Sequence, residues 1–477
     1  MIGVASDDRG PAANSAGPGL SIGPGPTTRL TSSRTSVSPR ALQFLSKESG
    51  SAGLLLTATV LALVWANVPG AGYDSFWHTD VVLQIGSWST ALDFQHIVND
   101  AAMAIFFLVV GLEISREVTV GELTDRRTVI IPVLGAIGGL VLPALIYLAF
   151  QPTGPAAAGW GIPISTDTAF LLGILALFGP RCPDQIRLFL LTLAIVDDIG
   201  AITVMAIFYT DDVSLPALGV VAALVAILVF MRWARMWKLR PYILVGIALW
   251  CAVFESGLHP TLAGVILGVI IPTAAVEPEQ RERVRAYGRL AIQRADATRA
   301  RLASAAVRAT VPANERLQDA LHPVSALVVV PLFGLANAGV VLNADALSAA
   351  SSSSVTIGII VALVVGNGVG ISIAAGLALK FGLGYLPGQV RYGHLIGGAV
   401  LAGIGFTISL FITDLAFDDP TLQQDAKIGV LVGSAIAAIL GSVLLRYLGE
   451  RLPLCSLADA DNPPSLPVGP WIDPTLR

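Results

Sequence analysis

The sequence predicts an all-α polytopic membrane protein with twelve transmembrane helices. Apolar residues make up 54% of its 477 residues and charged residues only 13%, whereas soluble domains carry roughly 25% charged residues. The lysines and arginines are placed so that six long stretches of the chain contain neither residue. Several acidic residues lie inside these apolar stretches, where an unpaired charge is costly.

Each of the six stretches can hold two spans and an outer loop, because a membrane-crossing helix needs about 20 residues. In chain order the stretches are 48–115, 128–180, 188–231, 241–280, 317–379 and 392–426. The last stretch is short, so Lys427 is expected near the outer start of the twelfth span. The positive-inside rule assigns the basic connections between the stretches, and both chain ends, to the cytoplasm.

Outside the spans the sequence predicts two tails and one long basic loop. Residues 1–46 are predicted to be a disordered cytoplasmic tail, because this end is rich in Gly, Pro, Ser and Thr and lacks the apolar segment of a secretory signal. The spans occupy 47–452, and 453–477 form a cytoplasmic C-terminal tail. The cytoplasmic loop 277–316 carries nine arginines, so it is either a solvated helical segment or a binding segment for anionic lipid head groups.

One outer segment has the pattern of a short β-hairpin. The sequence V-V-L-Q-I-G-S-W-S-T (81–90) alternates in polarity around a Gly-Ser turn. The exposed edge of such a hairpin can pair with a second copy of the chain. We therefore expect a homodimer that forms through the 81–90 hairpin on the extracytoplasmic side.

Two adjacent carboxylates stand in the middle of the predicted fifth span. Asp197 and Asp198 lie in A-I-V-D-D-I-G-A-I (194–202), with no basic residue between Arg187 and Arg232. Adjacent residues on a helix point about 100° apart. One of the two is therefore expected to line a cavity, and the other to face a neighbouring helix.

Polar residues also interrupt the predicted fourth and eleventh spans. The fourth contains Thr166 and Asp167 in G-I-P-I-S-T-D-T-A-F, where the proline and the hydroxyl residues compete with helical hydrogen bonding. The eleventh contains L-A-G-I-G-F-T-I-S (401–409), and the tenth carries Asn367. Paired interrupted spans in the two halves of a transporter point to a binding site near the membrane midplane.

This set of acids indicates a chemistry. No predicted span contains a lysine or arginine, so the buried carboxylates need protons, a bound metal cation, or both. A desolvated carboxylate can exchange a bound proton for a bound metal cation near neutral pH. Competition between a proton and a cation at one carboxylate is the minimum requirement for a cation–proton exchanger, which needs no cofactor and is not an enzyme.

Two other classes of protein also place aspartates in spans. An intramembrane aspartic protease would share a proton between two facing carboxylates, but the Tyr-Asp and Gly-x-Gly-Asp sequences typical of those enzymes do not surround Asp167, Asp197 or Asp198. A sodium-coupled symporter of a small solute would need a roomy polar cavity, and the polar groups predicted at mid-membrane depth are small and few.

Seven blocks of the sequence resemble, in order, the NhaA family of bacterial sodium–proton antiporters. The blocks are F-F-L-V-V-G-L-E-I-S-R-E, P-I-S-T-D-T-A-F, A-I-V-D-D-I-G-A-I, Y-I-L-V-G-I-A-L-W, H-P-T-L-A-G-V-I, P-L-F-G-L-A-N-A-G and G-I-G-F-T-I-S. The resemblance covers about residues 48–450 and omits both tails and much of 277–316.

The resemblance implies an inverted repeat of spans 3–5 and 10–12, with spans 4 and 11 broken and crossing at the midplane. It implies that Asp198 and Asp197 bind the transported Na⁺ or Li⁺, and that Thr166 and Asp167 lie at the crossing and belong to the same cation- and proton-binding set. Glu113, His259 and His322 match positions linked to pH response or access. The implied protein is a pH-dependent antiporter of the bacterial inner membrane that acts in pH homeostasis and salt tolerance.

The chain departs from the family pattern at Asn367, where the family has a lysine followed by a proline. That lysine would face Asp197 and is commonly assigned a role in proton coupling. Asparagine cannot titrate, although it can hydrogen-bond Asp197. We therefore expect exchange that begins at higher pH or is electroneutral. The departure also leaves open the possibility that the chain is a degenerate paralogue that no longer transports.

No nucleic-acid partner is expected.

Overall fold

The computed structural model of the chain describes residues 48–85, 88–121, 126–178, 184–210, 214–234, 236, 238–273, 278–293, 296–386 and 390–451. All of these residues lie in one compact unit, Gln43–Arg477. The predicted tails 1–46 and 453–477 lie outside the described residues, so the predictions made for them stay predictions.

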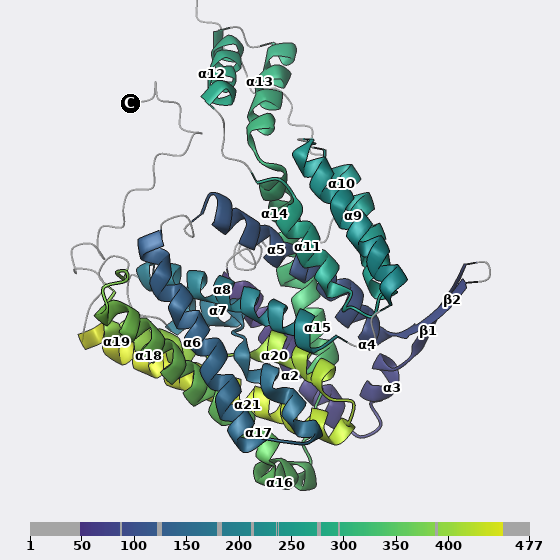
Figure 1. Ribbon diagram of the computed structural model, residues 1–477, viewed down its shortest axis with the longest axis vertical. Coiled ribbons are helices and arrows are strands. Elements are labelled where there is room, and N and C mark those ends of the chain that lie inside the picture. Colours follow the sequence, from purple (N-terminus) through teal and green to yellow (C-terminus); the bar gives the residue numbers. More distant parts are fainter. Residues whose placement is uncertain are drawn as a thin grey trace, which may run out of the picture. The chain divides into compact units, whose positions relative to one another are not determined.

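The described chain is almost entirely helical, with one pair of strands (Figure 1). The elements of the first half are α2 (Glu48–Asn67), α3 (Tyr73–Trp77), β1 (Asp80–Ile85), β2 (Trp88–Asp93), α4 (Phe94–His96), η1 (Ile97–Ala102), α5 (Met103–Thr119), α6 (Arg126–Phe150), η3 (Pro155–Ile164), α7 (Thr168–Phe178), α8 (Asp184–Phe208) and α9 (Leu215–Trp233). Those of the second half are α10 (Leu239–Phe254), α11 (Thr261–Ile270), α12 (Pro278–Gln293), α13 (Ala297–Thr310), α14 (Ala313–Val324), η4 (Ser325–Val329), α15 (Val330–Asn337), α16 (Ala344–Ser352), α17 (Ser354–Val361), η5 (Ala362–Gly366), α18 (Asn367–Lys380), α19 (Tyr392–Leu401), α20 (Phe406–Ala416) and α21 (Pro420–Arg451).

Within the described residues, eight helices are long and apolar enough to cross a membrane, and the number rises to ten if each of two bent helix pairs is one span. Two further apolar helices, Leu239–Phe254 and Thr261–Ile270, are shorter. The polytopic membrane architecture predicted from composition is therefore confirmed at this coarser level, and the count of twelve spans stays a prediction.

The two bent pairs are the interruptions that the sequence predicted. Helix η3, a 3₁₀-helix, meets α7 at 45°, and α19 meets α20 at 46°. Pro163 in η3 lacks a backbone donor. Gly403 and Gly405 lie in the second break, where glycine's low helix propensity favours a helix end.

Three of the long helices contain a π-helical segment that the sequence did not predict: η1 before α5, η4 between α14 and α15, and η5 between α17 and α18. A π-helical turn inserts one extra residue into an α-helix, and such turns are frequent at functional sites. The segment η5 ends directly before Asn367.

Close helix packing relies on small residues. A Cβ atom at Gly264 or Gly268 of α11 would lie 2.2 Å from the carbonyl oxygen of Ala104 or 2.6 Å from that of Leu108 in α5. Only glycine allows the two backbones to approach this closely. Small residues at such contacts are typical of helix packing in membrane proteins. Helices α12 and α13 pack against each other, and their outer surfaces are largely exposed.

The predicted hairpin segment forms two antiparallel strands that extend beyond 81–90, because β1 and β2 pair from Asp80 with Asp93 to Ile85 with Trp88. The expected turn residues, Gly86 and Ser87, lie outside the described residues. At the base of the strands, the Asp93 carboxylate contacts Nδ1 of His78 at 3.1 Å and Nδ1 of His96 at 2.7 Å.

Candidate cation site at the crossing of two broken helices

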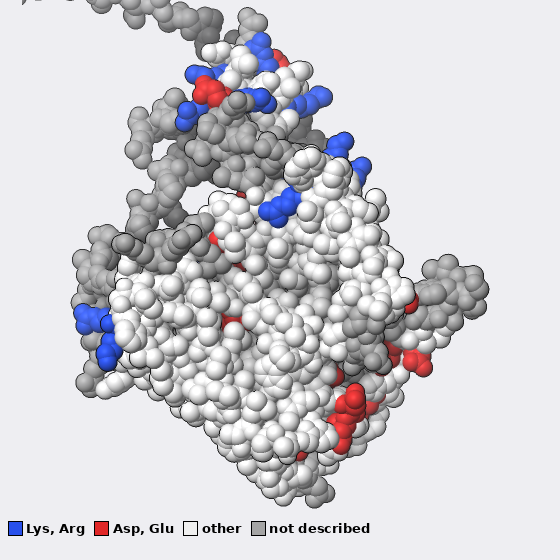
Figure 2. Space-filling view, in the orientation of Figure 1, with Lys and Arg blue, Asp and Glu red and all other residues white. Residues whose placement is uncertain are grey.

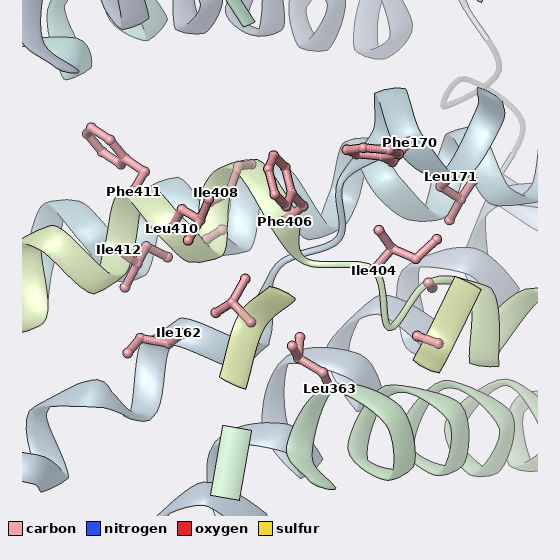
Figure 3. Packing of buried hydrophobic residues seen from close by; sticks show 14 of the residues in the cluster. Ile162, Phe170, Leu171, Leu363, Ile404, Phe406, Ile408, Leu410, Phe411 and Ile412 are labelled. Atoms are coloured by element: carbon pink, nitrogen blue, oxygen red, sulfur yellow. The ribbon is translucent and has the colours of Figure 1, made fainter. Parts of the chain in front are cut away.

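The breaks in the two bent pairs lie against each other. The Asp167 N–H donates to the Ile404 carbonyl at 2.5 Å, and the Thr166 hydroxyl donates to the Ala402 carbonyl at 2.8 Å. Figure 3 shows the two extended linkers side by side, with Phe170 and Phe406 above them. The rings of these two phenylalanines meet edge to face with centroids 5.3 Å apart.

The close approach of the linkers requires a glycine. A Cβ atom at Gly405 would lie 2.9 Å from the backbone oxygen of Ser165. A further bond joins the pairs, because the Ser409 hydroxyl donates to the Ile162 carbonyl at 2.6 Å. The crossing is thus held by three hydrogen bonds that backbone carbonyls accept, one from a backbone N–H and two from side-chain hydroxyls.

Asp167 caps two helices at once. One carboxylate oxygen accepts from the Phe170 N–H at 3.0 Å, at the start of α7. The other accepts from the Thr407 N–H at 3.0 Å, at the start of α20. A helix N-terminus carries about half a positive charge, so this 2% exposed side chain offsets the positive ends of both helices. Asp167 acts here as a structural counter-charge.

The two neighbouring aspartates of α8 have different surroundings. An Asp197 carboxylate oxygen accepts from the Thr166 N–H at 2.7 Å, so Asp197 faces the break of the fourth predicted span. Asp198 instead lines a cavity, and its Oδ1 is buried without a hydrogen-bond partner. The expected division between a cavity-lining and a helix-facing carboxylate is confirmed. Both residues lie midway along α8 and are 2% and 7% exposed.

The cavity beside Asp198 has a volume of about 200 Å³. Its polar lining includes Glu113, Asp167, Asp198 and His322, and its described lining contains no lysine or arginine. Glu113, Asp167 and Asp197 are close enough to act electrostatically on Asp198. A cavity with this lining disfavours anions and favours a proton or a small metal cation.

Comparisons with known proteins agree with this geometry. The family described as Na⁺/H⁺ antiporter 1 matches residues 42–445. The chain belongs to the NhaA family of Na⁺/H⁺ antiporters. It is 58% identical over 453 residues to Na⁺/H⁺ antiporter NhaA 3 of Frankia alni, a match that covers 95% of this chain and 97% of that protein.

Two further relatives support the family membership. Na⁺/H⁺ antiporter NhaA 1 of a Mycobacterium species is 46% identical over 402 residues, which cover 84% of this chain and 66% of that protein. Na⁺/H⁺ antiporter NhaA of a Janthinobacterium species is 43% identical over 415 residues, which cover 84% of this chain and 91% of that protein. The resemblance inferred from seven sequence blocks is therefore confirmed.

Asn367, the departure from the NhaA pattern, bonds differently from what the sequence suggested. Its amide nitrogen donates to the carbonyls of Pro163 at 3.2 Å and Leu363 at 3.3 Å rather than to Asp197. Its Oδ1 has no partner, and the side chain is fully buried. The Pro163 carbonyl lies in the helix that ends at the break, and the Asn367 amide is long enough to reach it.

The three residues matched to pH response or access fall into two places. Glu113 and His322 line the cavity with Asp198. His259 is separate from that lining, and its Nε2 contacts the Tyr209 carbonyl. The structure thus brings two of the three to the candidate site.

Thr168 is a polar cavity residue that the sequence analysis did not single out. Thr168, the first residue of α7, lines the cavity, and its Oγ1 is buried without a hydrogen-bond partner. It directly follows Asp167 in S-T-D-T, so the signal in the sequence was a third hydroxyl residue in this motif.

Within the described residues, no cluster of three or more His, Cys, Asp or Glu could hold a resident metal ion.

Proposed function

We propose that the chain exchanges cytoplasmic Na⁺ or Li⁺ for external protons, with Asp198 as the main cation and proton ligand and Asp197 as its partner. The observation that carries this proposal is the Asp198 carboxylate, buried in a small acid-lined cavity with an unpartnered oxygen. A buried carboxylate in this position must bind either a proton or a cation. The names of the relatives, all Na⁺/H⁺ antiporters, support the same exchange.

Each of the other residues has a proposed role at this site. Thr166 and Asp167 hold the crossing that presents Asp197 and Asp198, through the contacts at 2.7 Å and 3.0 Å described above. Glu113 and His322 line the same cavity, so a change in their charge alters how strongly Asp198 holds a cation. His259 is proposed to act on access through its contact with Tyr209.

The alternatives find less support. The described contacts of Asp167 and Asp197 are with backbone N–H groups, not with each other as a protease dyad would require. A cavity of about 200 Å³ is below the range of roughly 300–1,000 Å³ that ligand pockets usually have. This favours an inorganic ion over an organic solute. A transporter rather than an enzyme is therefore the proposed class.

The proposed topology has twelve spans, both ends in the cytoplasm and a location in the bacterial inner membrane. The eight long helices, the two bent pairs, and α10 and α11 supply these spans. Lys and Arg gather over α12 and α13, whereas Asp and Glu gather near β1 and α3 (Figure 2). The positive-inside rule then assigns α12 and α13 to the cytoplasmic side. Broken helices in both halves fit an inverted repeat of spans 3–5 and 10–12.

The proposed partners are a second copy of the chain and anionic lipids. The β1–β2 pair has free edges that can extend the sheet across a two-fold axis. Helix α12 exposes Leu290 and Ile292 beside its arginines, a combination typical of helices that lie on an anionic membrane surface. No cofactor is proposed.

The function is tested by adding Na⁺ to proteoliposomes that hold a preset pH gradient, read by a pH-sensitive dye. The proposal predicts that Na⁺ and Li⁺ collapse the gradient, whereas choline at the same ionic strength does not. A gradient that no alkali cation disturbs at any pH would contradict antiport and favour a degenerate paralogue.

A further inference from the structure

Threonine hydroxyls elsewhere in the helices show how this side chain is normally satisfied. Thr59, Thr192 and Thr413 each donate to the carbonyl four residues earlier, at distances of 2.8 to 2.9 Å. Such a bond needs a preceding helical turn. Thr168 is the first residue of α7 and follows the break, so it has no such turn. Its Oγ1 is consequently buried without a partner.

Four buried oxygens near the crossing have no hydrogen-bond partner. They belong to Ser165, Thr168, Asp198 and Asn367. Of these, Thr168 and Asp198 line the cavity, whereas Ser165 and Asn367 do not. Neither oxygen has a partner at full hydrogen-bonding geometry, but the Thr168 side chain is close enough to act on the Asp198 carboxylate as a hydrogen-bonding group. One neutral and one acidic oxygen therefore meet in the same small space.

We propose that the Thr168 hydroxyl is a neutral ligand of the transported cation, beside the acidic oxygen of Asp198. This inference rests on the proposed function and adds a residue to its site. Na⁺ and Li⁺ are hard cations that take oxygen ligands. A buried polar oxygen without a partner costs free energy, and a cation in the cavity removes that cost for both side chains.

The neighbouring hydroxyl is less suited to the same role. The Thr166 hydroxyl already donates to the Ala402 carbonyl and holds the crossing. Asp167 uses both carboxylate oxygens to cap α7 and α20. Asp167 also reduces the positive field at the start of α7 that would otherwise repel a cation from Thr168.

The test replaces Thr168 by valine, which keeps the shape and removes the oxygen, and by serine, which keeps the oxygen. Thr192→Val is the matched control, because Thr192 is a buried threonine of α8 whose hydroxyl bonds the Leu188 carbonyl outside the cavity. Two quantities are measured in each protein. One is the KM for Na⁺ in proteoliposomes, and the other is the Na⁺ concentration that protects the detergent-solubilised protein from thermal unfolding, with choline as the salt control.

In Thr168→Val the bound Na⁺ loses one oxygen ligand. This loss should raise both the KM for Na⁺ and the protecting Na⁺ concentration roughly tenfold, with little change in the maximal rate of exchange. Thr168→Ser should stay close to the parent, and so should Thr192→Val. Parent-like Na⁺ dependence of Thr168→Val would overturn the ligand role, and so would a serine variant as weak as the valine variant.

The two proposals fail in different ways. A parent protein that Na⁺ protects from thermal unfolding but that does not exchange Na⁺ would contradict antiport. The role of Thr168 would still be tested in that case, because the protecting Na⁺ concentrations of the parent and of Thr168→Val can be compared. A parent that exchanges Na⁺ with the same KM as Thr168→Val would contradict the Thr168 role alone. A parent with neither exchange nor protection would overturn both.

Discussion

Asp198 and Asp414 are both largely buried carboxylates in helices, and their surroundings are opposite. Asp414 in α20 is paired with the ammonium of Lys427 in α21 at 2.8 Å, and the two side chains are 14% and 13% exposed. Its other oxygen accepts from the Asn99 amide at 3.5 Å, and Asn99 in turn bonds Asn337. The described lining of the Asp198 cavity contains no lysine or arginine, and Oδ1 of Asp198 has no hydrogen-bond partner.

The comparison separates a structural carboxylate from a functional one. A buried charge is stable when a counter-charge and hydrogen bonds compensate it. Asp414 meets this condition within the chain, through Lys427 and Asn99. The described lining of the Asp198 cavity offers no lysine or arginine as a fixed counter-charge, so a proton or a cation from outside the chain is expected to compensate this carboxylate.

The largest effect is expected for Asp198→Asn. An amide cannot exchange a proton for a cation, so the rate of Na⁺-driven gradient collapse should fall to that of protein-free liposomes. The matched control is the double variant Asp414→Asn with Lys427→Met, which removes a buried carboxylate together with its partner. This control should keep measurable exchange. Equal losses in the two proteins would contradict the distinction between the two carboxylates.

Lys427→Met should lower the free energy of unfolding by about 3 kcal/mol, because it leaves the Asp414 carboxylate buried without its counter-charge. Unfolding in mixed micelles of increasing denaturing-detergent content measures this change. Adding Asp414→Asn to the same protein should restore most of the lost stability. If the double variant is less stable than the single one, the ion pair is not what compensates Asp414.

A smaller effect concerns the coupling of exchange to the membrane potential. Asn367 cannot carry charge, and its amide is held by the Pro163 and Leu363 carbonyls. The initial rate of exchange should therefore be the same at zero and at inside-negative clamped potential. Asn367→Ala should leave this independence unchanged. A parent rate that changes with the clamped potential would show that another group moves the charge.

The smallest effect is expected at the base of the strands. Burial raises the pKa of Asp93, but hydrogen bonds from the His96 N–H and from the His78 and His96 rings outweigh it and hold the pKa below its usual value. The stabilisation is thus present above the usual pKa and is lost as the pH falls through the lowered one. Amide exchange of β1 and β2, corrected for intrinsic rates, should be faster in Asp93→Asn at neutral pH.

As the pH falls from about 4, the usual pKa of an aspartate, through the lowered pKa of Asp93, parent and Asp93→Asn should converge, because the carboxylate of the parent becomes protonated only at the lowered pKa. A difference between the two proteins that persists or grows in acid would contradict this role of Asp93.

Much of the fold follows from the sequence, because its strongest signals are local. Lysine-free stretches predict apolar helices, Pro163 and the glycines near Gly405 predict the breaks, and alternating residues predict the strand pair. The π-helical segments were not predictable, since an extra residue in a turn leaves no compositional mark. The pairing of Asp414 with Lys427 depends on how α20 and α21 meet, which is a matter of tertiary packing.

The candidate site was predictable in its acids but not in its division of roles. Asp197 and Asp198 stand out because carboxylates are rare in apolar runs. That Asp167 caps two helices is visible only once α7 and α20 meet. Thr168 was missed because a threonine in an apolar helix is normally satisfied by the preceding turn, and here the break removes that turn.

The central claim, that a proton and a cation compete for Asp198, is tested most directly by calorimetric titration of Na⁺ into the purified protein in buffers of different ionisation enthalpy. Heat that varies with the buffer reports protons released on binding. The parent and the Asp414→Asn, Lys427→Met double variant should release protons when Na⁺ binds, whereas Asp198→Asn should show neither binding nor release. Na⁺ binding with undiminished proton release in Asp198→Asn would contradict the account.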